Sequence, residues 1–255
     1  LIEEMVGRKV ENLYPKEEHG FGEEVLRVEH LSVPHPNIRG RNIVDDISFS
    51  LRRGEILGIG GLVGAGRSES LGAIFGQYTN GVKKQVFLDG REVSINSPKD
   101  AINLGIGFIT EERKRNGIIW MLGIRENMSV ANLPKLPGKF FVKRDHERKS
   151  VGEQMERLRV KAPSMETAVV QLSGGNQQKV ILGKWLMSKP RILFVDEPTK
   201  GIDVGTKADF YKIMSDLTMQ GVSIVMVSSD MPELMSMSDR CLVISNGRIT
   251  AELEK

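Results

Sequence analysis

The most constraining feature of this sequence is a glycine-rich turn between an apolar run and a helical pattern. The run from Ile56 to Ile59 is continuously apolar, which is typical of a strand buried on both faces. The turn GGLVGAGRSES follows, and its glycines allow the backbone to close around an anion where a Cβ would collide. A helical pattern comes next, so main-chain N–H groups and the helix dipole face the turn. This order predicts a phosphate-binding loop.

The turn matches the P-loop pattern G-x-x-x-x-G-K-[ST] at all defined positions but one. Gly61, Gly66 and Ser68 fall in register, and Arg67 stands where the pattern has lysine. A glycine-rich turn is also common as plain structural punctuation, so the rest of the chain must decide whether it binds a nucleotide. The expected nucleotide contacts are Gly61, Leu62, Val63, Gly64, Ala65, Gly66, Arg67, Ser68 and Glu69.

Composition narrows the class of protein. The chain of 255 residues can form one large domain with a subdomain, and its net charge of +3, without a charge run, argues against a nucleic-acid partner. Cys241 is the only cysteine, so no internal disulfide can form; we expect it to pack, in a protein of a reducing compartment. The uncharged stretches, such as Ile56 to Gly66, are all shorter than the roughly 18 residues of a membrane span. Because the chain begins with Leu1 and no signal peptide, we expect it to be part of a longer polypeptide with an upstream half.

Hydrophobic periodicity predicts an α/β fold with an antiparallel β subdomain and a helical insertion. From Val25, alternating patterns around VLRVEHLSV, residues 47–51 and residues 86–88 predict half-exposed antiparallel strands. Ser97 followed by proline predicts a helix start, and IGFIT a strand. Within the insertion, Val151, Met155 and Leu158 share a helical face. The second half predicts a helix capped by Ser173 that ends before Pro190, a strand at 191–197, a helix at 207–217 with Phe210, Ile213 and Leu217 on one face, a strand at 222–229, and a hairpin through Asn246-Gly247.

Two carboxylates supply the second element that a P-loop enzyme requires. Asp196 and Glu197 end the apolar run ILFV, at the expected carboxyl end of a buried strand. There Asp196 would hold Mg²⁺ together with the Ser68 hydroxyl, and Glu197 would polarise the attacking water. Acidic residues also end strands at the solvent edge for no functional reason, but their pairing with a P-loop favours the metal site.

The motif LSGGNQQK, with these elements in this order, resembles the ATP-binding-cassette (ABC) family over residues 25 to 250. LSGGNQQKV, DEPTKGIDVG and ITEERKRNGI resemble the C-terminal ATPase half of bacterial monosaccharide importers of the ribose and galactose type, and MVGRKVENLYPK resembles the linker between their two fused cassettes. The resemblance implies a RecA-like P-loop NTPase core at 25–111 and 176–255, a helical signature subdomain at 112–175, and an inter-cassette linker at 1–24. ATP and Mg²⁺ are the implied cofactors.

The family resemblance also implies a second anion site and a set of partners. Ser173 and the glycine N–H groups at a helix start would face the nucleotide held by another cassette, with contacts from Leu172, Ser173, Gly174, Gly175 and Asn176. The implied partners are that second cassette, N-terminal in the same full-length chain, membrane permease subunits and, indirectly, an extracytoplasmic sugar-binding protein. The implied location is the cytoplasmic face of the inner membrane, through the permease.

Three positions depart from the family pattern. Arg67 keeps the charge of the usual lysine but is larger and planar. Glu111 stands at the position of a glutamine that senses metal and γ-phosphate, where a carboxylate either joins the metal or repels phosphate, and Ser229 replaces the switch histidine. We expect Glu111, Glu197 and Ser229 to be the catalytic positions and Ser68, Asp196 and Glu111 the metal-binding ones, in a site that binds ATP and turns it over slowly.

Several readings remain open from the sequence alone. His35 lies where the family often places an aromatic ring against adenine, although an exposed loop histidine is the simpler explanation. Trp120 and Met121 lie near where family members meet the permease, or in the core. The leading function is an ATP-hydrolysing motor domain for monosaccharide import; the alternative is a non-hydrolysing nucleotide-binding module that completes its partner's site. A cassette acting on DNA or ribosomes is disfavoured by the low net charge and the modest insertion. The sequence does not identify the sugar.

Overall fold

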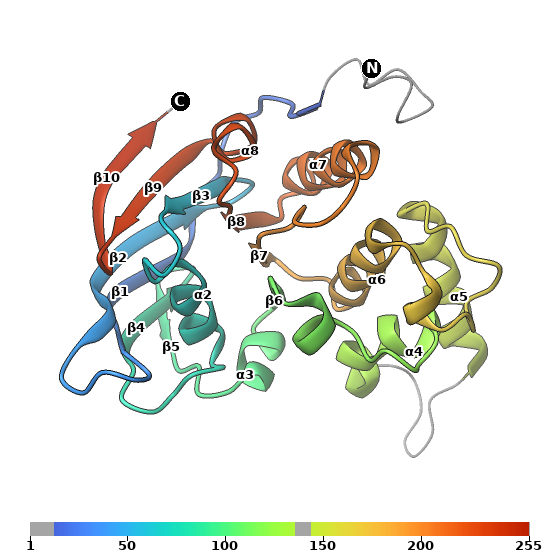
Figure 1. The fold of residues 1–255 in the computed structure, drawn as a ribbon, viewed down its shortest axis with the longest axis horizontal. Helices are drawn as coiled ribbons and strands as arrows, with labels where there is room; N and C mark the ends of the chain where they lie inside the picture. Colours follow the sequence, from blue (N-terminus) through green and yellow to red (C-terminus); the bar gives the residue numbers. More distant parts are fainter. Residues whose placement is uncertain (1–12, 136–143, 255) are drawn as a thin grey trace.

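The computed structural model describes residues 13–135 and 144–254, in which two sheets lie side by side with helices beyond them (Figure 1). The larger sheet has six strands, and all of them run parallel except β10, which pairs antiparallel with β9. In spatial order the strands are β10 (Arg248–Glu254), β9 (Arg240–Ser245), β3 (Ile56–Gly61), β8 (Ser223–Val227), β7 (Ile192–Asp196) and β6 (Ile106–Ile109).

The interior position of β3 confirms the strand predicted before the glycine turn. Its residues Ile56 to Gly60 are buried, as are all residues of β6, β7 and β8. Such continuously apolar strands are stable only where helices cover both faces of a parallel sheet. In Figure 1, α7 and α8 lie on one side of this sheet and α2 and α3 on the other. The carboxyl ends of β3, β6, β7 and β8 therefore share one edge, which is where ligands bind in open α/β sheets.

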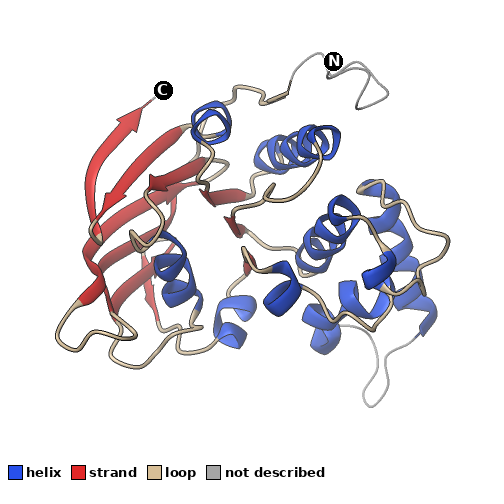
Figure 2. Ribbon diagram, in the orientation of Figure 1, coloured by secondary structure: helices blue, strands red, loops and turns tan. Residues whose placement is uncertain are grey.

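The smaller sheet is antiparallel, as the alternating patterns predicted (Figure 2). Along β1 and β2, buried residues such as Leu26, Val28 and Leu51 alternate with more exposed polar ones. The two types of sheet confirm the α/β expectation. Its spatial order is β2 (Asn42–Arg52), β1 (Glu24–Pro34), β4 (Lys83–Leu88) and β5 (Arg91–Val93).

Side-chain caps explain where several helices begin. The Ser97 and Ser173 side chains accept hydrogen bonds from the main-chain N–H groups of Asp100 and Asn176, which confirms both predicted starts. The predicted start of α7 at 207 is wrong, because the Asp203 carboxylate accepts from Thr206 N–H and the helix begins at Val204. The helices of the α/β part are α2 (Arg67–Phe75), α3 (Pro98–Asn103), α6 (Gly174–Met187), α7 (Val204–Met219) and α8 (Met231–Met237).

Between β6 and β7 the chain is helical, as expected for the insertion. Val151 is fully buried, and Leu158, predicted on the same helix, is buried just beyond the end of α5. The division of the chain at 111/112 and 175/176 stays a prediction, and α6 runs across the second boundary. The segments are the π-helical η1 (Arg113–Gly117), α4 (Ile124–Ser129), η2 (Val130–Lys135), α5 (Arg144–Arg157) and η3 (Val169–Gln171).

Residues 13–23 have no regular secondary structure but pack on the α/β part. The Tyr14 and Tyr211 rings lie 5.3 Å apart, Lys16 forms an ion pair with Asp239, and the His19 ring contacts the Gly54 carbonyl. Residues 1–12 of the predicted linker lie outside the described residues, so the linker role stays a prediction. Along residues 13–135 and 144–254, no helix combines the length and the apolar character needed to cross a bilayer.

Candidate functional site

The glycine-rich turn connects β3 directly to α2, and close contacts require glycine at two of its positions. A Cβ at Gly61 would lie 2.3 Å from the Ile244 carbonyl oxygen, and one at Gly66 would lie 2.5 Å from the Ile43 carbonyl oxygen. Both residues also have positive φ angles, of 148° and 99°. The turn is therefore fixed in place by β9 and β2, and the side chains of Leu62 and Val63 are exposed at its tip.

Arg67, which stands at the lysine position of the P-loop pattern, points into the protein. Arg67 is 7% exposed, and its Nη1 donates to the Ser228 carbonyl at 2.9 Å. Its Nη2 lies 3.7 Å from Glu197 Oε1. The guanidinium thus joins the ends of β7 and β8 to the start of α2.

Asp196 ends β7 with its carboxylate buried beside the turn. Its side chain hydrogen-bonds with Ser68, and among the described residues Oδ1 has no hydrogen-bond partner. Burial, which is the largest cause, and the charges of Glu111 and Glu197 together raise the pKa of Asp196 to about 7, although the Ser68 hydrogen bond and Arg67 lower it. A buried carboxylate oxygen beside a hydroxyl matches the oxygen ligands that Mg²⁺ prefers, and a bound cation would favour the ionised form. These residues fit a magnesium site.

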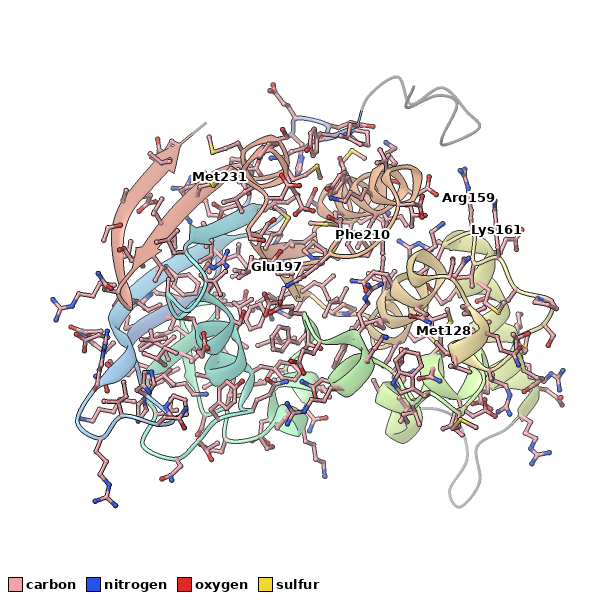
Figure 3. All side chains as sticks on the ribbon, viewed as in Figure 1. Met128, Arg159, Lys161, Glu197, Phe210 and Met231 are labelled. Atoms are coloured by element: carbon pink, nitrogen blue, oxygen red, sulfur yellow. The ribbon has the colours of Figure 1, made fainter. Side chains whose placement is uncertain are left out.

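Glu197 adopts an uncommon backbone conformation at the same edge. Its φ is +47°, and its main-chain N–H donates to the Val227 carbonyl of β8. The Ser229 hydroxyl donates to Glu197 Oε2 at 3.1 Å. Burial raises the pKa of the Glu197 carboxyl, while the Ser229 hydrogen bond and Arg67 lower it. Figure 3 shows Glu197 near the middle of the molecule, among side chains from several elements.

Glu111, two residues beyond β6, has a partner that the sequence did not reveal. Lys200 Nζ lies 2.7 Å from Glu111 Oε1, and both side chains are partly exposed. The hydrogen bond that Lys200 donates to Glu111 raises the pKa of Lys200. The carboxylate that was expected either to join the metal or to repel phosphate therefore carries its own counter-ion. The catalytic and metal-binding roles of Glu111 and Ser229 remain predictions.

His35 borders the same turn. It lines a pocket with Leu62 to Ala65 and with residues 41–43 and 245–247. Its Nδ1 accepts from the main-chain N–H groups of Asn37 and Ile38, both at 3.1 Å. The ring thus stabilises the 35–38 loop, and stacking against adenine stays a prediction.

The signature residues form a second polar pocket at the start of α6. Ser173 Oγ accepts from Asn176 Nδ2 at 3.1 Å, and Asn176 Oδ1 accepts from the main-chain N–H of Lys161 at 2.8 Å. Gly175 and Thr206 line the same pocket, and Arg159 and Lys161 extend outward from its rim (Figure 3). The pocket residues Ser173, Gly175 and Asn176 lie at the start of α6, and the turn at 61–68 leads into α2; these two helices lie apart in Figure 1.

The sequence predicted most residues of the first site but not three basic residues near it. The structure gathers Arg67, Ser68, Asp196, Glu197 and Ser229 at one sheet edge, with Glu111 at its margin. It adds Lys200 beside Glu111, Arg113 against the start of α6, and Lys184 against η1. Arg113 and Lys200 lie within ITEERKRNGI and DEPTKGIDVG, which indicated only the family resemblance and no contact of these side chains, and Lys184 lies outside any motif.

Comparison with known proteins gives one family. The family model described as ABC transporter matches residues 44–200. The xylose import ATP-binding protein of Geobacillus kaustophilus is 46% identical over 255 residues, which is 100% of this chain and 50% of that protein. The protein of the same name from Yersinia pseudotuberculosis is 46% identical over 254 residues, 99% of this chain and 50% of its own length. The chain thus spans about half the length of these curated relatives.

Solved structures agree on the fold. A dimeric ATP-binding cassette in a post-hydrolysis state with ADP and Pi has a TM-score of 0.77 at 20% identity, covering 90% of this chain and 98% of the other. A nucleotide-free cassette from an ABC transporter has a TM-score of 0.76 at 21% identity, covering 91% of both chains. The RecA-like core with antiparallel and helical additions is confirmed.

Proposed function

The chain belongs to the ABC transporter family, and from that membership we propose that it is an ATP-binding cassette whose ATPase activity drives import of a monosaccharide through a separate membrane permease. One observation carries the proposal at this site: the buried Oδ1 of Asp196 has no partner among the described residues and lies beside a glycine turn built for phosphate. An uncompensated carboxylate is costly to bury unless a cation binds there. ATP with Mg²⁺ supplies the cation for the Asp196 carboxylate and the phosphate groups for the glycine turn.

In this proposal each residue at the edge has one task. The main-chain N–H groups of 61–68 bind the phosphates, and Ser68 and Asp196 hold Mg²⁺, whose charge would offset the developing negative charge on the phosphates. Glu197 accepts the proton of the attacking water, for which a pKa raised by burial is an advantage. Ser229 orients the Glu197 carboxylate through its hydrogen bond.

The site of this chain is proposed to turn over slowly. Arg67 already donates to the Ser228 carbonyl and lies beside Glu197, so binding phosphate would require it to give up or share those contacts. Ser229 carries no charge to place on a phosphate. These contacts favour a second candidate in the same family, a module that binds ATP without hydrolysing it. In either case the signature residues Leu172 to Asn176 serve the nucleotide of a partner cassette.

The partners follow from the relatives. Because the chain spans half of each xylose import ATP-binding protein, a second cassette in the same full-length chain is proposed upstream. A permease places the complex at the cytoplasmic face of the inner membrane, and an extracytoplasmic binding protein delivers the sugar. Xylose is the first sugar to test.

The test compares the two sites in the full-length chain with its permease. Gly174→Asp is expected to abolish transport, because a carboxylate in the signature faces the partner's nucleotide, whereas Arg67→Ala is expected to reduce transport by less. Single-turnover hydrolysis of labelled ATP measures each site.

Glu197→Gln is the control for residual ATP hydrolysis at the site of this cassette. If the isolated cassette hydrolyses ATP at high concentration and Glu197→Gln removes that activity, the slow enzyme is favoured over the non-hydrolysing module. Equal rates at both sites would refute the asymmetry. Absence of saturable binding of ATP with Mg²⁺ to folded protein would refute the whole function.

A further inference from the structure

One arginine connects three segments that meet between the two sites. Arg113 begins η1, two residues after Glu111. Its Nη1 donates to the Gly174 carbonyl at 2.9 Å, in the first turn of α6. Its Nη2 donates to the Lys200 carbonyl at 2.8 Å and lies 3.4 Å from that of Gly201, in the loop that follows Glu197. The signature helix and the loop beyond the metal-binding edge are thus held by one side chain.

The geometry of this contact suits a guanidinium better than an ammonium. A planar fork with five N–H groups donates in two directions at once, whereas an ammonium is a compact point charge. Among the described residues Arg113 has no ion-pair partner, and burial lowers the pKa of its guanidinium. Its bonds are therefore directional contacts to main-chain oxygens. Such contacts define position and do not neutralise charge.

The junction is closely packed. A Cβ on Gly174 would lie 3.2 Å from the Gly201 carbonyl oxygen and 3.3 Å from Arg113 Nη1. Gly201 itself has a φ of +68°. A side chain at 174 would therefore require the loop or the guanidinium to shift by a few tenths of an ångström.

A second cation fastens the other end of η1 to the same helix. Lys184 Nζ, on the third turn of α6, donates to the Gly117 carbonyl at 2.7 Å. A Cβ on Gly117 would lie 2.8 Å from the Ile181 side chain of α6. Because both ends of η1 are bonded to α6, we expect the two helices to move as one piece.

The loop after Glu197 is attached to Glu111 as well. Lys200 uses its main-chain carbonyl to accept from Arg113 and its side chain to pair with Glu111. Arg113 N–H in turn donates to the Glu111 carbonyl at 3.0 Å. These contacts form a closed ring of Glu111, Arg113 and Lys200 beside the metal-binding edge, with Gly174 bonded to it.

We propose that Arg113 is a positioning residue that fixes the signature motif relative to Asp196 and Glu197. The metal-binding edge of this cassette and the surface it offers to the nucleotide of the partner cassette then move together. The inference rests on the proposed function of the two sites. Arg113 itself contacts neither the P-loop turn nor the Asp196 carboxylate through any bond in the described residues.

The first test measures steady-state ATP hydrolysis and ATP binding by the full-length chain in complex with its permease. Arg113→Lys is expected to lower kcat about tenfold, because loss of a charge-assisted hydrogen bond of about 1.4 kcal/mol corresponds to that factor. The Kd of ATP is expected to stay within twofold of the wild-type value, and the Tm within a few degrees. Arg115→Lys is the matched control, since Arg115 in the same segment is exposed and its guanidinium pairs, within the described residues, with Glu112 alone.

The second test is hydrogen exchange of the same protein without turnover. In Arg113→Met, amides of residues 173–177 and 199–203 are expected to exchange faster, while those of β3 stay unchanged. Wild-type kcat and unchanged exchange in the Arg113 variants would overturn the inference. A large loss of Tm and ATP binding in Arg113→Lys would also overturn it, since that outcome means a merely structural role. If the wild-type protein does not hydrolyse ATP, the proposed function fails, and the exchange measurement still decides the inference.

Discussion

Among single residues, Asp196 shows how a residue that suits ligand binding can lower the stability of the folded protein. Its carboxyl is buried, and its pKa is raised to about 7 mainly by that burial. A carboxyl with a raised pKa binds a proton more tightly in the folded state than in the unfolded one. The free energy of unfolding therefore falls as the pH rises from about 4 to about 7, and the full cost is present at pH 8.

Asp196→Asn is expected to stabilise the protein without ligand and to remove the Mg²⁺ dependence of ATP binding. At pH 8 the amide avoids a buried charge, so the Tm should rise by about 2–4 °C for about 1 kcal/mol. Thermal unfolding at pH 5 and pH 8 measures the effect, which should shrink at the lower pH. Asp216→Asn, at a partly exposed position on α7, is the control. A lower Tm for Asp196→Asn at pH 8 would contradict the argument.

Among the helices and strands, α6 carries both the signature and a partly buried lysine. Lys184 lies with its ammonium 5.1 Å from the Trp185 ring centre and bonded to Gly117 of η1. Burial lowers the pKa of Lys184 to about 8. Between pH 8 and its ordinary pKa of 10.5 the unfolded chain then binds more protons than the folded one, so the free energy of unfolding rises with pH across that interval.

Lys184→Met is expected to flatten this rise. The difference should amount to about 1–3 kcal/mol between pH 8 and pH 10.5, with loss of the bond to η1 added at every pH. Urea unfolding at several pH values measures it. Lys149→Met, at an exposed position on α5, should leave the slope as in the wild type. A Lys184→Met protein with the wild-type slope would show that Lys184 stays charged in the fold.

The sequence predicted the elements whose pattern is local and missed the contacts that depend on distant segments. The apolar run of β3, the caps of Ser97 and Ser173 and the Asn246-Gly247 turn are each visible within about ten residues, and all are confirmed. The start of α7 at Val204 was not predicted, because the capping role of Asp203 within DEPTKGIDVG was not recognised. Neither the Glu111 contact to Lys200 nor the Arg113 contact to Gly174 could be read from sequence, because 89 and 61 residues separate their partners.

For the molecule as a whole, the stretch before β1 is attached to the strand that leads into the glycine turn. Lys16 pairs with Asp239, whose Oδ2 accepts from Ile56 N–H at the start of β3. Both side chains of the pair are largely buried, at 5% and 13% exposed. The position of the N-terminal stretch is thereby linked to the central strand.

Lys16→Met is expected to destabilise the fold, because it leaves the Asp239 carboxylate buried without its cation. Breaking a buried pair costs about 3 kcal/mol, which lowers the Tm of a domain of this size by about 6–12 °C. Lys212→Met is the control, since Lys212 pairs with Glu17 of the same stretch but is partly exposed, and the Tm of this variant should change by less than about 2 °C. Equal melting temperatures for the two variants would argue against the link.

The left-handed backbone of Glu197 decides which inert form of the protein should be used to trap a bound complex. Glycine adopts a positive φ without steric cost, so a glycine there would relieve local strain on the order of 1 kcal/mol while deleting the carboxylate. Backbone strain and side-chain charge would then change together, and a slower or longer-lived complex would not show which of the two caused it. Glutamine keeps the size and the conformational cost of glutamate, so any gain in lifetime reports the missing charge alone.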